Sequence, residues 1–558
     1  MSVLSGVKKY SGVGHKCALA LVADDQRIDI QLFDLGGSCR QRGEPFDAFL
    51  DEPPLRQVLA RHELGAAYMA DGFARATGRP GVLNVVGGPG LTNALTGIAA
   101  ARQASSPVLV LTTTVAERLL GQDRPTTHEL PDQGTMIDSI AAWRFRVTRT
   151  DQIEPAVDEA FDRLAAFRPR PVVLEFTPDV LSAPAHSSGT AIRRRLSPAE
   201  PDGAAIREAA GLLAAARAPL IWAGGGSVPA AAELQELAEC LAAPVFTTDG
   251  SRGVMPDAHR LALGASWVPD DLVAQMLAAA DVVLAVGTTF SAYQTDDWTV
   301  PITGRIVQVD IDDTELGRNL PVAIGLHGDA GPTLARLLKA VPAGSGAARQ
   351  DRVEAAVAAA RGAVARTARV EAVRRTLSST GSVMELLDSI RDAVPADGIL
   401  AVDSLIGYWV SRHFPVAGPR SIQLDLTLGG LGFALPAAIG AKVGAPTRSV
   451  VALAGDGAFL FTGQELGTAV QEALALPIVV YNDGGYGSIR WNQRRRYGRL
   501  VAADMVQPDF VALGRAFGAR AVRVARVSDV GPAVAEALGA SGPTVIEVEL
   551  SIEPPYLG

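Results

Sequence analysis

The feature that most constrains this chain is a repeated unit, in which a short run of apolar residues precedes a glycine-rich turn and an alanine-rich stretch. Such runs occupy residues 82–86, 220–223 and 450–454, where GGPG, GGGS and GDG follow in turn. Short strands that are apolar throughout and alternate with helices are typical of parallel sheets covered on both faces. The pattern runs along almost the whole chain and predicts an α/β fold of doubly wound parallel sheets.

Two segments far apart in the sequence follow the same plan. Residues 81–112 and 449–482 each contain a strand, a glycine turn, an alanine-rich helix and a second strand. Each half also ends on a similar strand, RPVVLEF at 170–176 and GPTVIEVEL at 542–550. This is typical of a distant internal duplication, although related α/β architecture alone can give the same rhythm.

The length of 558 residues corresponds to about three domains. Between the two similar halves, the chain has strand–glycine–helix units of its own, and two stretches have the composition of linkers, 183–199 and 342–378. The second of these reads as an Ala/Arg helix. We therefore expect three domains, at residues 1–185, 198–342 and 375–558.

Composition excludes several classes of protein. The apolar share is 48% and the charged share 20%, so the chain is too apolar to be disordered. The net charge of −9 makes it a poor general binder of nucleic acid or anionic membranes. Its three cysteines, Cys17, Cys39 and Cys240, form neither a disulfide framework nor a metal-binding pair. Because no apolar run is long enough for a signal peptide or a membrane helix, we expect a cytoplasmic protein.

The most specific motif lies at the ends of two successive predicted strands. Gly455-Asp456-Gly457 follows the strand SVVALA, and Asn482-Asp483-Gly484-Gly485 follows the next strand, PIVVYN, 24 residues further on. Open α/β sheets bind ligands at the carboxyl ends of their strands. An Asp and an Asn there offer oxygen ligands for Mg²⁺, and flanking glycines let backbone N–H groups approach a phosphate. The alternative is a pair of ordinary strand–helix turns.

With this spacing, the chain resembles the thiamin-diphosphate-dependent enzymes, whose motif is GDG followed some two dozen residues later by an Asn doublet or a close variant. The resemblance implies thiamin diphosphate and Mg²⁺ as cofactors. By position, Asp456 and Asn482 would bind Mg²⁺ through their side chains and Gly484 through its backbone carbonyl. Gly455 and Gly457 would lie against the diphosphate.

The resemblance also implies residues of the first domain. The segment RHELGAAYMADGFARA, residues 61–76, matches the family segment that carries a glutamate against the aminopyrimidine ring, and this makes Glu63 the catalytic residue. The alternative for Glu63 is a solvated residue at a helix start, whereas His62 reads as structural. In GGPGLTN, residues 87–93, Gly87 and Gly88 correspond to a cofactor-binding turn.

A further match is LGGLGFALPAAIG, residues 428–440. Leu431 takes the place of the bulky apolar residue that holds the cofactor bent, with Gly430 beside it, although a leucine here could equally be plain core. A lone Gly-x-Gly is weak evidence for a dinucleotide loop.

The resemblance covers nearly the whole chain, in the order pyrimidine-binding domain, central domain and diphosphate-binding domain of the acetolactate synthase-like branch. It therefore implies three doubly wound domains. In that branch the active sites lie between two chains, so a homodimer or homotetramer acting on a small 2-oxo acid is expected, and a monomer should be inactive.

The reaction implied is decarboxylation of a 2-oxo acid through an enamine intermediate, with or without carboligation to a second carbonyl. Acetolactate synthase-type carboligation is the alternative. However, FSAYQTDDW, residues 290–298, lacks the arginine that grips the second oxo acid in those enzymes. This argues against acetolactate synthase proper; FAD stays open but is not expected.

The substrate pocket is read from two segments. FDLGGS places Gly37 and Ser38 where related decarboxylases face the substrate carboxylate. HELPDQGTM, residues 128–136, is similar to a stretch of the 5-guanidino-2-oxopentanoate decarboxylases. His128, Glu129 and Gln133 could then read a polar or cationic substrate tail, or could belong to a surface loop.

Two other classes remain as alternatives. A non-catalytic cofactor-binding protein need not retain Glu63, Asp456 and Asn482 together. A nicotinamide or flavin oxidoreductase would need a full dinucleotide fingerprint, but the turn GGGSVP at 224–229 lacks its last glycine. The sequence leaves the acyl donor and any acceptor open.

Overall fold

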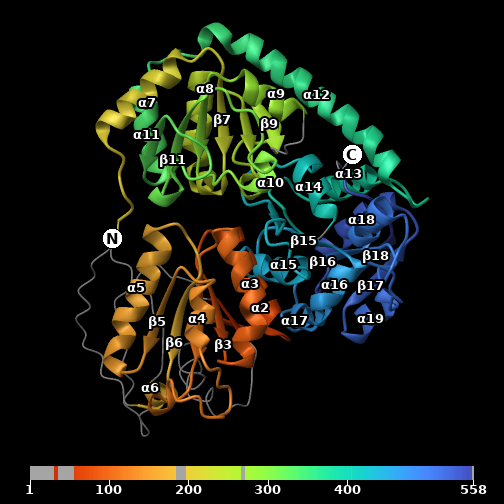
Figure 1. Cartoon of the computed structure of the whole chain (residues 1–558). Helices are drawn as coiled ribbons and strands as arrows, with labels where there is room; N and C mark the ends of the chain where they lie inside the picture. The colour runs from red at the N-terminus through yellow and green to blue at the C-terminus, as the bar shows by residue number, and fades with distance from the viewer. Residues whose placement is uncertain (1–30, 35–55, 184–196, 266–270, 404, 556–558) are drawn as a thin grey trace. The chain divides into compact units, whose positions relative to one another are not determined.

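The computed structural model describes residues 31–34, 56–183, 197–265, 271–403 and 405–555. In this part of the chain the strands form three six-stranded sheets, in which every paired strand is parallel. Helices pack against the strands of each sheet (Figure 1). The predicted fold class, three doubly wound parallel-sheet domains, is confirmed.

The first sheet has the strand order β2-β1-β3-β4-β6-β5. Its inner strands β3, β4 and β6 are almost wholly buried, which explains why the sequence reads there as continuous apolar runs. Its strands are β1 (Gln31–Asp34), β2 (Arg56–Leu59), β3 (Gly81–Val85), β4 (Val108–Thr113), β5 (Trp143–Val147) and β6 (Val172–Phe176). The helices around it are α2 (Glu63–Thr77), α3 (Pro89–Gln103), α4 (Gln133–Asp138), α5 (Ile153–Ala166) and α6 (Pro178–Ser182).

The central sheet has a different order, β12-β11-β10-β7-β8-β9. On β7, Ile221 and Ala223 join one core cluster while Leu220 and Trp222 join another, so both faces of this sheet are covered. Its strands are β7 (Pro219–Ala223), β8 (Val245–Thr247), β9 (Ala262–Ala265), β10 (Val282–Val286), β11 (Arg305–Asp310) and β12 (Ile324–His327). Its helices are α7 (Gly203–Ala215), α8 (Ala231–Leu241), α9 (Asp271–Ala279), α10 (Ala292–Thr295) and α11 (Ala330–Ala340).

The third sheet repeats the plan of the first, with the order β14-β13-β15-β16-β18-β17. Counted along the chain, both orders are 2-1-3-4-6-5, as an internal duplication would produce. Its strands are β13 (Ile399–Val402), β14 (Ile422–Leu424), β15 (Val450–Gly455), β16 (Pro477–Asn482), β17 (Arg520–Val524) and β18 (Thr544–Glu549). The helices of this third of the chain are α13 (Val383–Ala393), α14 (Ile406–His413), α15 (Ala434–Gly444), α16 (Asp456–Thr462), α17 (Leu466–Gln471), α18 (Gly487–Tyr497), α19 (Phe510–Ala516) and α20 (Val530–Leu538).

The linker helix expected within 342–378 is α12 (Gln350–Arg375). It contacts β9 of the central sheet and α13 at the start of the third domain. A capping box starts α13, because Ser382 Oγ accepts from Glu385 N and Glu385 Oε2 accepts from Ser382 N. Most of the other expected linker, 183–199, lies outside the described residues.

By its contacts the chain divides into two compact units. The first comprises residues 1–197, 428–446 and 462–474, and the second comprises residues 198–427, 447–461 and 475–558. The first sheet thus shares its unit with α15 and α17, which come from the last third of the chain.

Within the first unit, α2 and α15 pack backbone to backbone. A Cβ on Gly72 of α2 would lie 2.2 Å from Ala437 O, and one on Gly440 of α15 would lie 1.9 Å from Met69 O. Glycine is therefore required at both crossing points. This close packing fixes the helix whose first residue is Glu63.

No helix among the described residues combines the length and the apolar character needed to cross a bilayer.

Candidate active site

The ends of β15 and β16, which are neighbours in the third sheet, bring together the oxygens of Asp456 and Asn482. Asp456 is 2% exposed. Its Oδ2 accepts from Gly484 N at 2.9 Å and from Gly485 N at 3.0 Å, while Oδ1 accepts from Gly457 N at 2.8 Å. Asn482 Oδ1 accepts from the same Gly484 N at 3.2 Å. Two of the predicted ligand oxygens thus converge on one N–H group.

This donor set fits a hard divalent cation. Burial raises the pKa of Asp456, opposed by the hydrogen bonds from the three glycine N–H groups, so a buried carboxylate here would gain from a positive charge beside it. Mg²⁺ prefers carboxylate, amide and carbonyl oxygens and keeps places for phosphate. The described residues hold no cluster of three His, Cys, Asp or Glu side chains suited to a metal. The predicted Mg²⁺ ligands, Asp456, Asn482 and the carbonyl of Gly484, include only one carboxylate and so do not form such a cluster.

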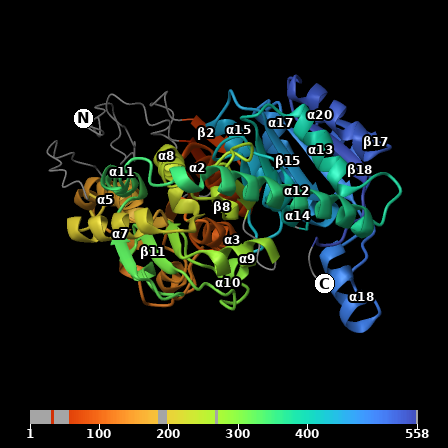
Figure 2. The ribbon, with the colours of Figure 1, turned by 90° about the horizontal axis from the view of Figure 1, so that it is seen from above.

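The residue after Asn482 has a role that sequence reasoning missed. Asp483 Oδ1 lies 2.6 Å from an amino nitrogen of Arg490, and that nitrogen also donates to Asp483 O at 2.6 Å. Burial, and then the charge of Asp456, raise the pKa of Asp483 to about 7. Arg490 is therefore paired with Asp483 within the loop. The basic run at 494–496 is exposed on α18, which extends away from the other elements of its unit (Figure 2).

The glycines of the GDG turn leave room for two aromatic rings. A Cβ on Gly455 would lie 3.0 Å from the ring of Tyr481, and one on Gly457 would lie 3.0 Å from the ring of Tyr486. Both distances are tighter than ordinary van der Waals contact. Side chains larger than hydrogen would therefore displace these rings and the backbone at the head of α16.

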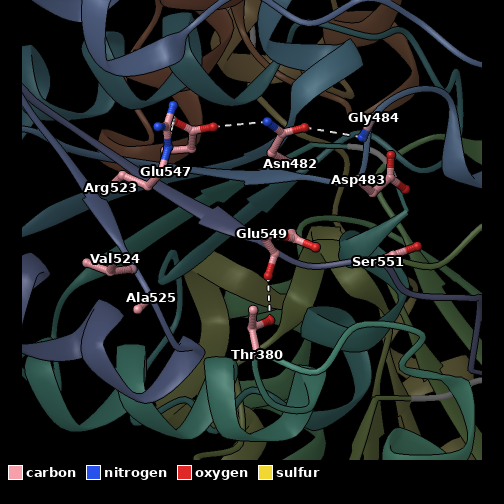
Figure 3. Close-up of a pocket in the computed structure, with 10 residues that line it drawn as sticks. All are labelled: Thr380, Asn482, Asp483, Gly484, Arg523, Val524, Ala525, Glu547, Glu549 and Ser551. Atoms are coloured by element: carbon pink, nitrogen blue, oxygen red, sulfur yellow. Dashed lines mark hydrogen bonds and ion pairs between the residues drawn. The ribbon is translucent and has the colours of Figure 1, made fainter.

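A cavity of about 630 Å³ borders the same loop, at the carboxyl edge of the third sheet (Figure 3). Three of its ten lining residues are acidic and one is an arginine. The lining residues are Thr380, Asn482, Asp483, Gly484, Arg523, Val524, Ala525, Glu547, Glu549 and Ser551.

In the first unit, Glu63 is the first residue of α2 and is 9% exposed. Its neighbour His62 caps the helix, since His62 Nδ1 accepts from Leu64 N at 3.1 Å, and so has the structural role expected of it. Glu63 Oε2 accepts from Asn93 Nδ2 at 3.1 Å. A Cβ on Gly90 would lie 3.4 Å from Glu63 Oε1. Sequence reasoning missed Asn93, although it ends the GGPGLTN run.

Gln133 holds the turn that contains Gly87 and Gly88. Gly88 N donates to Gln133 Oε1 at 2.9 Å, and Gly87 N donates to Thr113 Oγ1 at 3.0 Å. Gln133 Nε2 donates to Thr113 O at 2.9 Å and to Glu175 Oε1 at 3.0 Å. The buried carboxamide thus uses both hydrogens and its oxygen within the protein. Its geometry suits the positioning of the turn, and its expected contact with substrate stays a prediction.

The other predicted pocket residues lie as follows. The His128 backbone packs on Gly88, where a Cβ would lie 2.6 Å from His128 O. Glu129 Oε2 accepts from Thr126 N at 3.1 Å and from Thr126 Oγ1 at 3.0 Å. Leu431 is half-buried in the turn before α15, directly after Gly430. Gly37 and Ser38 lie outside the described residues.

A buried acid that sequence reasoning did not single out lies at the start of α2. Glu465 is fully buried and accepts from Arg61 N at 3.0 Å and His62 N at 2.9 Å. It also accepts from Thr468 Oγ1 at 2.8 Å. Burial raises the pKa of Glu465 to about 7. No local pattern marks it, because both N–H donors come from some 400 residues earlier in the chain.

We expect Glu465→Gln to stabilise the protein at alkaline pH. The folded pKa of about 7 exceeds the unfolded value near 4.5, so this carboxyl stabilises the fold most below pH 4, and that contribution is lost as the pH rises through 7. The difference corresponds to roughly 3 kcal/mol. A Gln keeps a side-chain oxygen that can accept from Arg61 N and His62 N, and its nitrogen can donate to Thr468 Oγ1. Thermal unfolding should show a gain of several degrees at pH 8 and a much smaller gain at pH 5.

The exposed Glu117→Gln serves as the control for this variant and should behave as wild type at both pH values. An equal gain from Glu465→Gln at pH 5 and pH 8 would contradict the assignment of the pH effect to this carboxyl.

Comparison with known proteins places these features in a family. Three models of thiamine pyrophosphate enzymes match, namely the N-terminal TPP binding domain at residues 37–136, the central domain at 206–337 and the C-terminal TPP binding domain at 405–548.

Whole-length relatives agree with these matches. A Pseudomonas aeruginosa protein named "Probable 2-ketoarginine decarboxylase" is 38% identical over 88% of this chain and 87% of its own length. An acetolactate synthase of Mycobacterium bovis is 33% identical over 87% of this chain and 80% of its own length. The acetolactate synthase large subunit of Corynebacterium glutamicum is 32% identical, with coverage of 88% and 80%. This chain belongs to the thiamin-diphosphate-dependent enzymes, in their acetolactate synthase-like branch.

Proposed function

We propose that this protein is a thiamin-diphosphate- and Mg²⁺-dependent decarboxylase of a 2-oxo acid with a polar or cationic tail, for which 5-guanidino-2-oxopentanoate is the first candidate. The observation that carries the proposal is the 38% identity, over 88% of this chain, to the relative named as a 2-ketoarginine decarboxylase. The run HELPDQGTM at 128–136 supports the same substrate class.

Each of the predicted site residues would have a distinct role in binding the cofactors or in the reaction. Asp456, Asn482 and the carbonyl of Gly484 would hold Mg²⁺, and Gly455 and Gly457 would lie against the diphosphate. When bound, thiamin diphosphate supplies an electron sink for the cleavage of the bond next to the oxo group. Glu63, poorly solvated and held by Asn93, exchanges a proton with the pyrimidine ring.

Carboligation is the second candidate, because acetolactate synthases are also relatives over most of this chain. The segment 290–298 argues against it, since it carries no arginine for a second oxo acid. In the structure, α10 (Ala292–Thr295) and a half-exposed Trp298 follow the buried Phe290 there. We therefore place decarboxylation first and do not expect FAD.

A panel of 2-oxo acids tests the substrate. Purified protein with thiamin diphosphate and Mg²⁺ should release CO₂ from 5-guanidino-2-oxopentanoate and form the matching aldehyde, while pyruvate should turn over far more slowly. CO₂ release and chromatography of aldehydes and acyloins measure both reactions. If pyruvate alone reacts and yields only 2-hydroxy-2-methyl-3-oxo acids, carboligation replaces decarboxylation as the function.

We also propose a homodimer or homotetramer, with Glu63 of one copy serving the cation site of another. Support comes from the acetolactate synthase-like branch, in which active sites lie between two chains. Light scattering of the purified protein measures the assembly, and a fully active monomer would contradict it.

A further inference from the structure

We propose that Glu547 is a positioning residue that orients the carboxamide of Asn482, so that its oxygen and not its nitrogen faces the cation loop. The inference rests on the proposed Mg²⁺ site and adds a residue to it. Glu547 lies on β18, next to β16 in the third sheet, and forms part of the wall of the cavity in Figure 3.

The orientation of an amide follows from its partners. Asn482 Nδ2 donates to Glu547 Oε1 at 2.9 Å, and Asn482 Oδ1 accepts from Gly484 N at 3.2 Å. Figure 3 shows the Asn482 amide between these two groups. An ionised carboxylate only accepts hydrogen bonds, so the amide nitrogen must face Glu547. The oxygen, the only atom of this amide that can bind Mg²⁺, is thereby turned to the loop.

The carboxylate of Glu547 is itself held in place. Glu547 is 4% exposed, and its Oε2 lies 2.9 Å from both Nε and an amino nitrogen of Arg523. Arg523 is the residue of β17 directly opposite Glu547 in the sheet. A guanidinium only donates, so the Glu547 oxygen that faces Arg523 must accept its hydrogen bonds. Both oxygens of Glu547 are thus assigned, one to each neighbour.

The first sheet contains a related arrangement. Glu175 lies on β6 opposite Arg146 of β5, and Arg146 is 3.2 Å from Glu175 Oε2. Unlike Glu547, Glu175 also has a second arginine, since Arg144 lies 2.8 Å from the same Oε2. Glu175 Oε1 accepts from Gln133 Nε2, and Gln133 Oε1 accepts from Gly88 N. In each sheet, therefore, a buried glutamate with an arginine opposite it directs a carboxamide oxygen towards a glycine N–H of a loop.

The carboxamides come from different places, the start of α4 in one sheet and the end of β16 in the other. The glutamate and arginine, in contrast, keep their places in the shared strand order. Outer partners that fix the orientation of a metal ligand typically change metal affinity by about 10- to 100-fold. Glu547 has the position and the chemistry of such a partner.

The variant Glu547→Gln tests the idea sharply. Because Arg523 still demands an acceptor, the new Gln must turn its oxygen to Arg523 and its nitrogen to Asn482. The oxygen of Asn482 then has to accept a hydrogen bond from the Gln nitrogen, so the amide of Asn482 flips and its own nitrogen faces the cation loop. We expect Mn²⁺ affinity, measured by electron paramagnetic resonance in the presence of thiamin diphosphate, to fall by about 10- to 100-fold.

The double variant Glu547→Gln/Arg523→Leu is the matched control. Without the guanidinium, the Gln can offer its oxygen to Asn482 again, so most of the lost Mn²⁺ affinity should return. Arg523→Leu alone leaves the Glu547 side chain able to accept from Asn482 Nδ2, so it should lose far less Mn²⁺ affinity than Glu547→Gln. A merely structural role for Glu547 would not produce this recovery, because the double variant removes more native contacts.

Asn482→Ala separates the two ways in which the inference can fail. If Asn482→Ala weakens Mn²⁺ binding but Glu547→Gln does not, the cation site stands and the role of Glu547 is refuted. If neither variant changes Mn²⁺ binding, the cation site is itself wrong and the inference falls with it. Loss of affinity in Glu547→Gln without recovery in the double variant also refutes the orienting role.

Discussion

Glu63→Gln is expected to reduce turnover by about two to four orders of magnitude while thiamin diphosphate still binds. The substitution keeps the size of the side chain and an oxygen that can accept from Asn93, 3.1 Å away in the native protein. It removes only the ability to take up and release a proton at the start of α2. Steady-state CO₂ release measures turnover, and exchange of the cofactor C2 proton, followed by quenched-flow NMR, reports the proton transfer directly.

Glu236→Gln, at an exposed carboxyl of α8, is the control and should leave both rates unchanged. Calorimetry with thiamin diphosphate shows whether the cofactor still binds to the Glu63 variant. A variant with normal turnover and normal C2 exchange would remove Glu63 from the reaction. If cofactor binding were lost as well, the residue would have a binding role in place of the assigned one.

Asp456→Ala is expected to abolish Mg²⁺-dependent binding of thiamin diphosphate. Asp456 is the one carboxylate in the predicted ligand set, and its oxygens lie on the N–H groups of Gly457, Gly484 and Gly485. Its removal takes the negative charge from the site and leaves these donors without their acceptor. Calorimetric titration with thiamin diphosphate, with Mg²⁺ and then with a chelator, measures the effect.

Because those N–H groups lose a partner in the Ala variant, Asp456→Asn provides the matched test. An Asn keeps an acceptor for the loop but carries no charge, so it should fold with a normal circular dichroism spectrum and still bind Mg²⁺ and cofactor poorly. Normal cofactor binding by Asp456→Asn, or by wild type after chelation, would argue against a cation at this turn.

Mixing the two inactive variants tests where the complete site forms. If Glu63 of one copy serves Asp456 of another, a hybrid of Glu63→Gln and Asp456→Ala chains contains one intact site. Activity should then reappear after the two variants are unfolded and refolded together. Failure to recover any activity, with hybrids present on native gels, would place both residues of a site in the same chain.

Much of this protein is predictable from the sequence because the information is local. Strands such as 450–455 are apolar throughout since both faces of a parallel sheet are buried, and this alone gives the fold class. Asp456 directly follows β15 and Asn482 is the last residue of the neighbouring β16, so their proximity follows from the topology of a parallel sheet. His62 beside Glu63 reads as structural in the sequence, and the structure shows that it caps α2.

Contacts between distant parts of the chain are decided only by the tertiary structure. Nothing near Glu465 in the sequence indicates that Arg61 and His62 will donate to it, or that burial will raise its pKa to about 7. The pairing of Arg490 with Asp483 likewise depends on how the loop after β16 folds back on α18.

The same distinction applies to the polar side chains that hold the site. The sequence predicts Asn482 as a ligand from its position at the end of a strand, but the partner of its amide nitrogen is Glu547, which lies 65 residues further along the chain. Gln133 and Glu175, 42 residues apart, are joined in the same way. Hydrophobic periodicity and turn residues are patterns of neighbouring positions, so they can be recognised in the sequence alone. The direction of a buried polar group is set by whichever donors and acceptors folding brings around it, and only the folded chain contains that information.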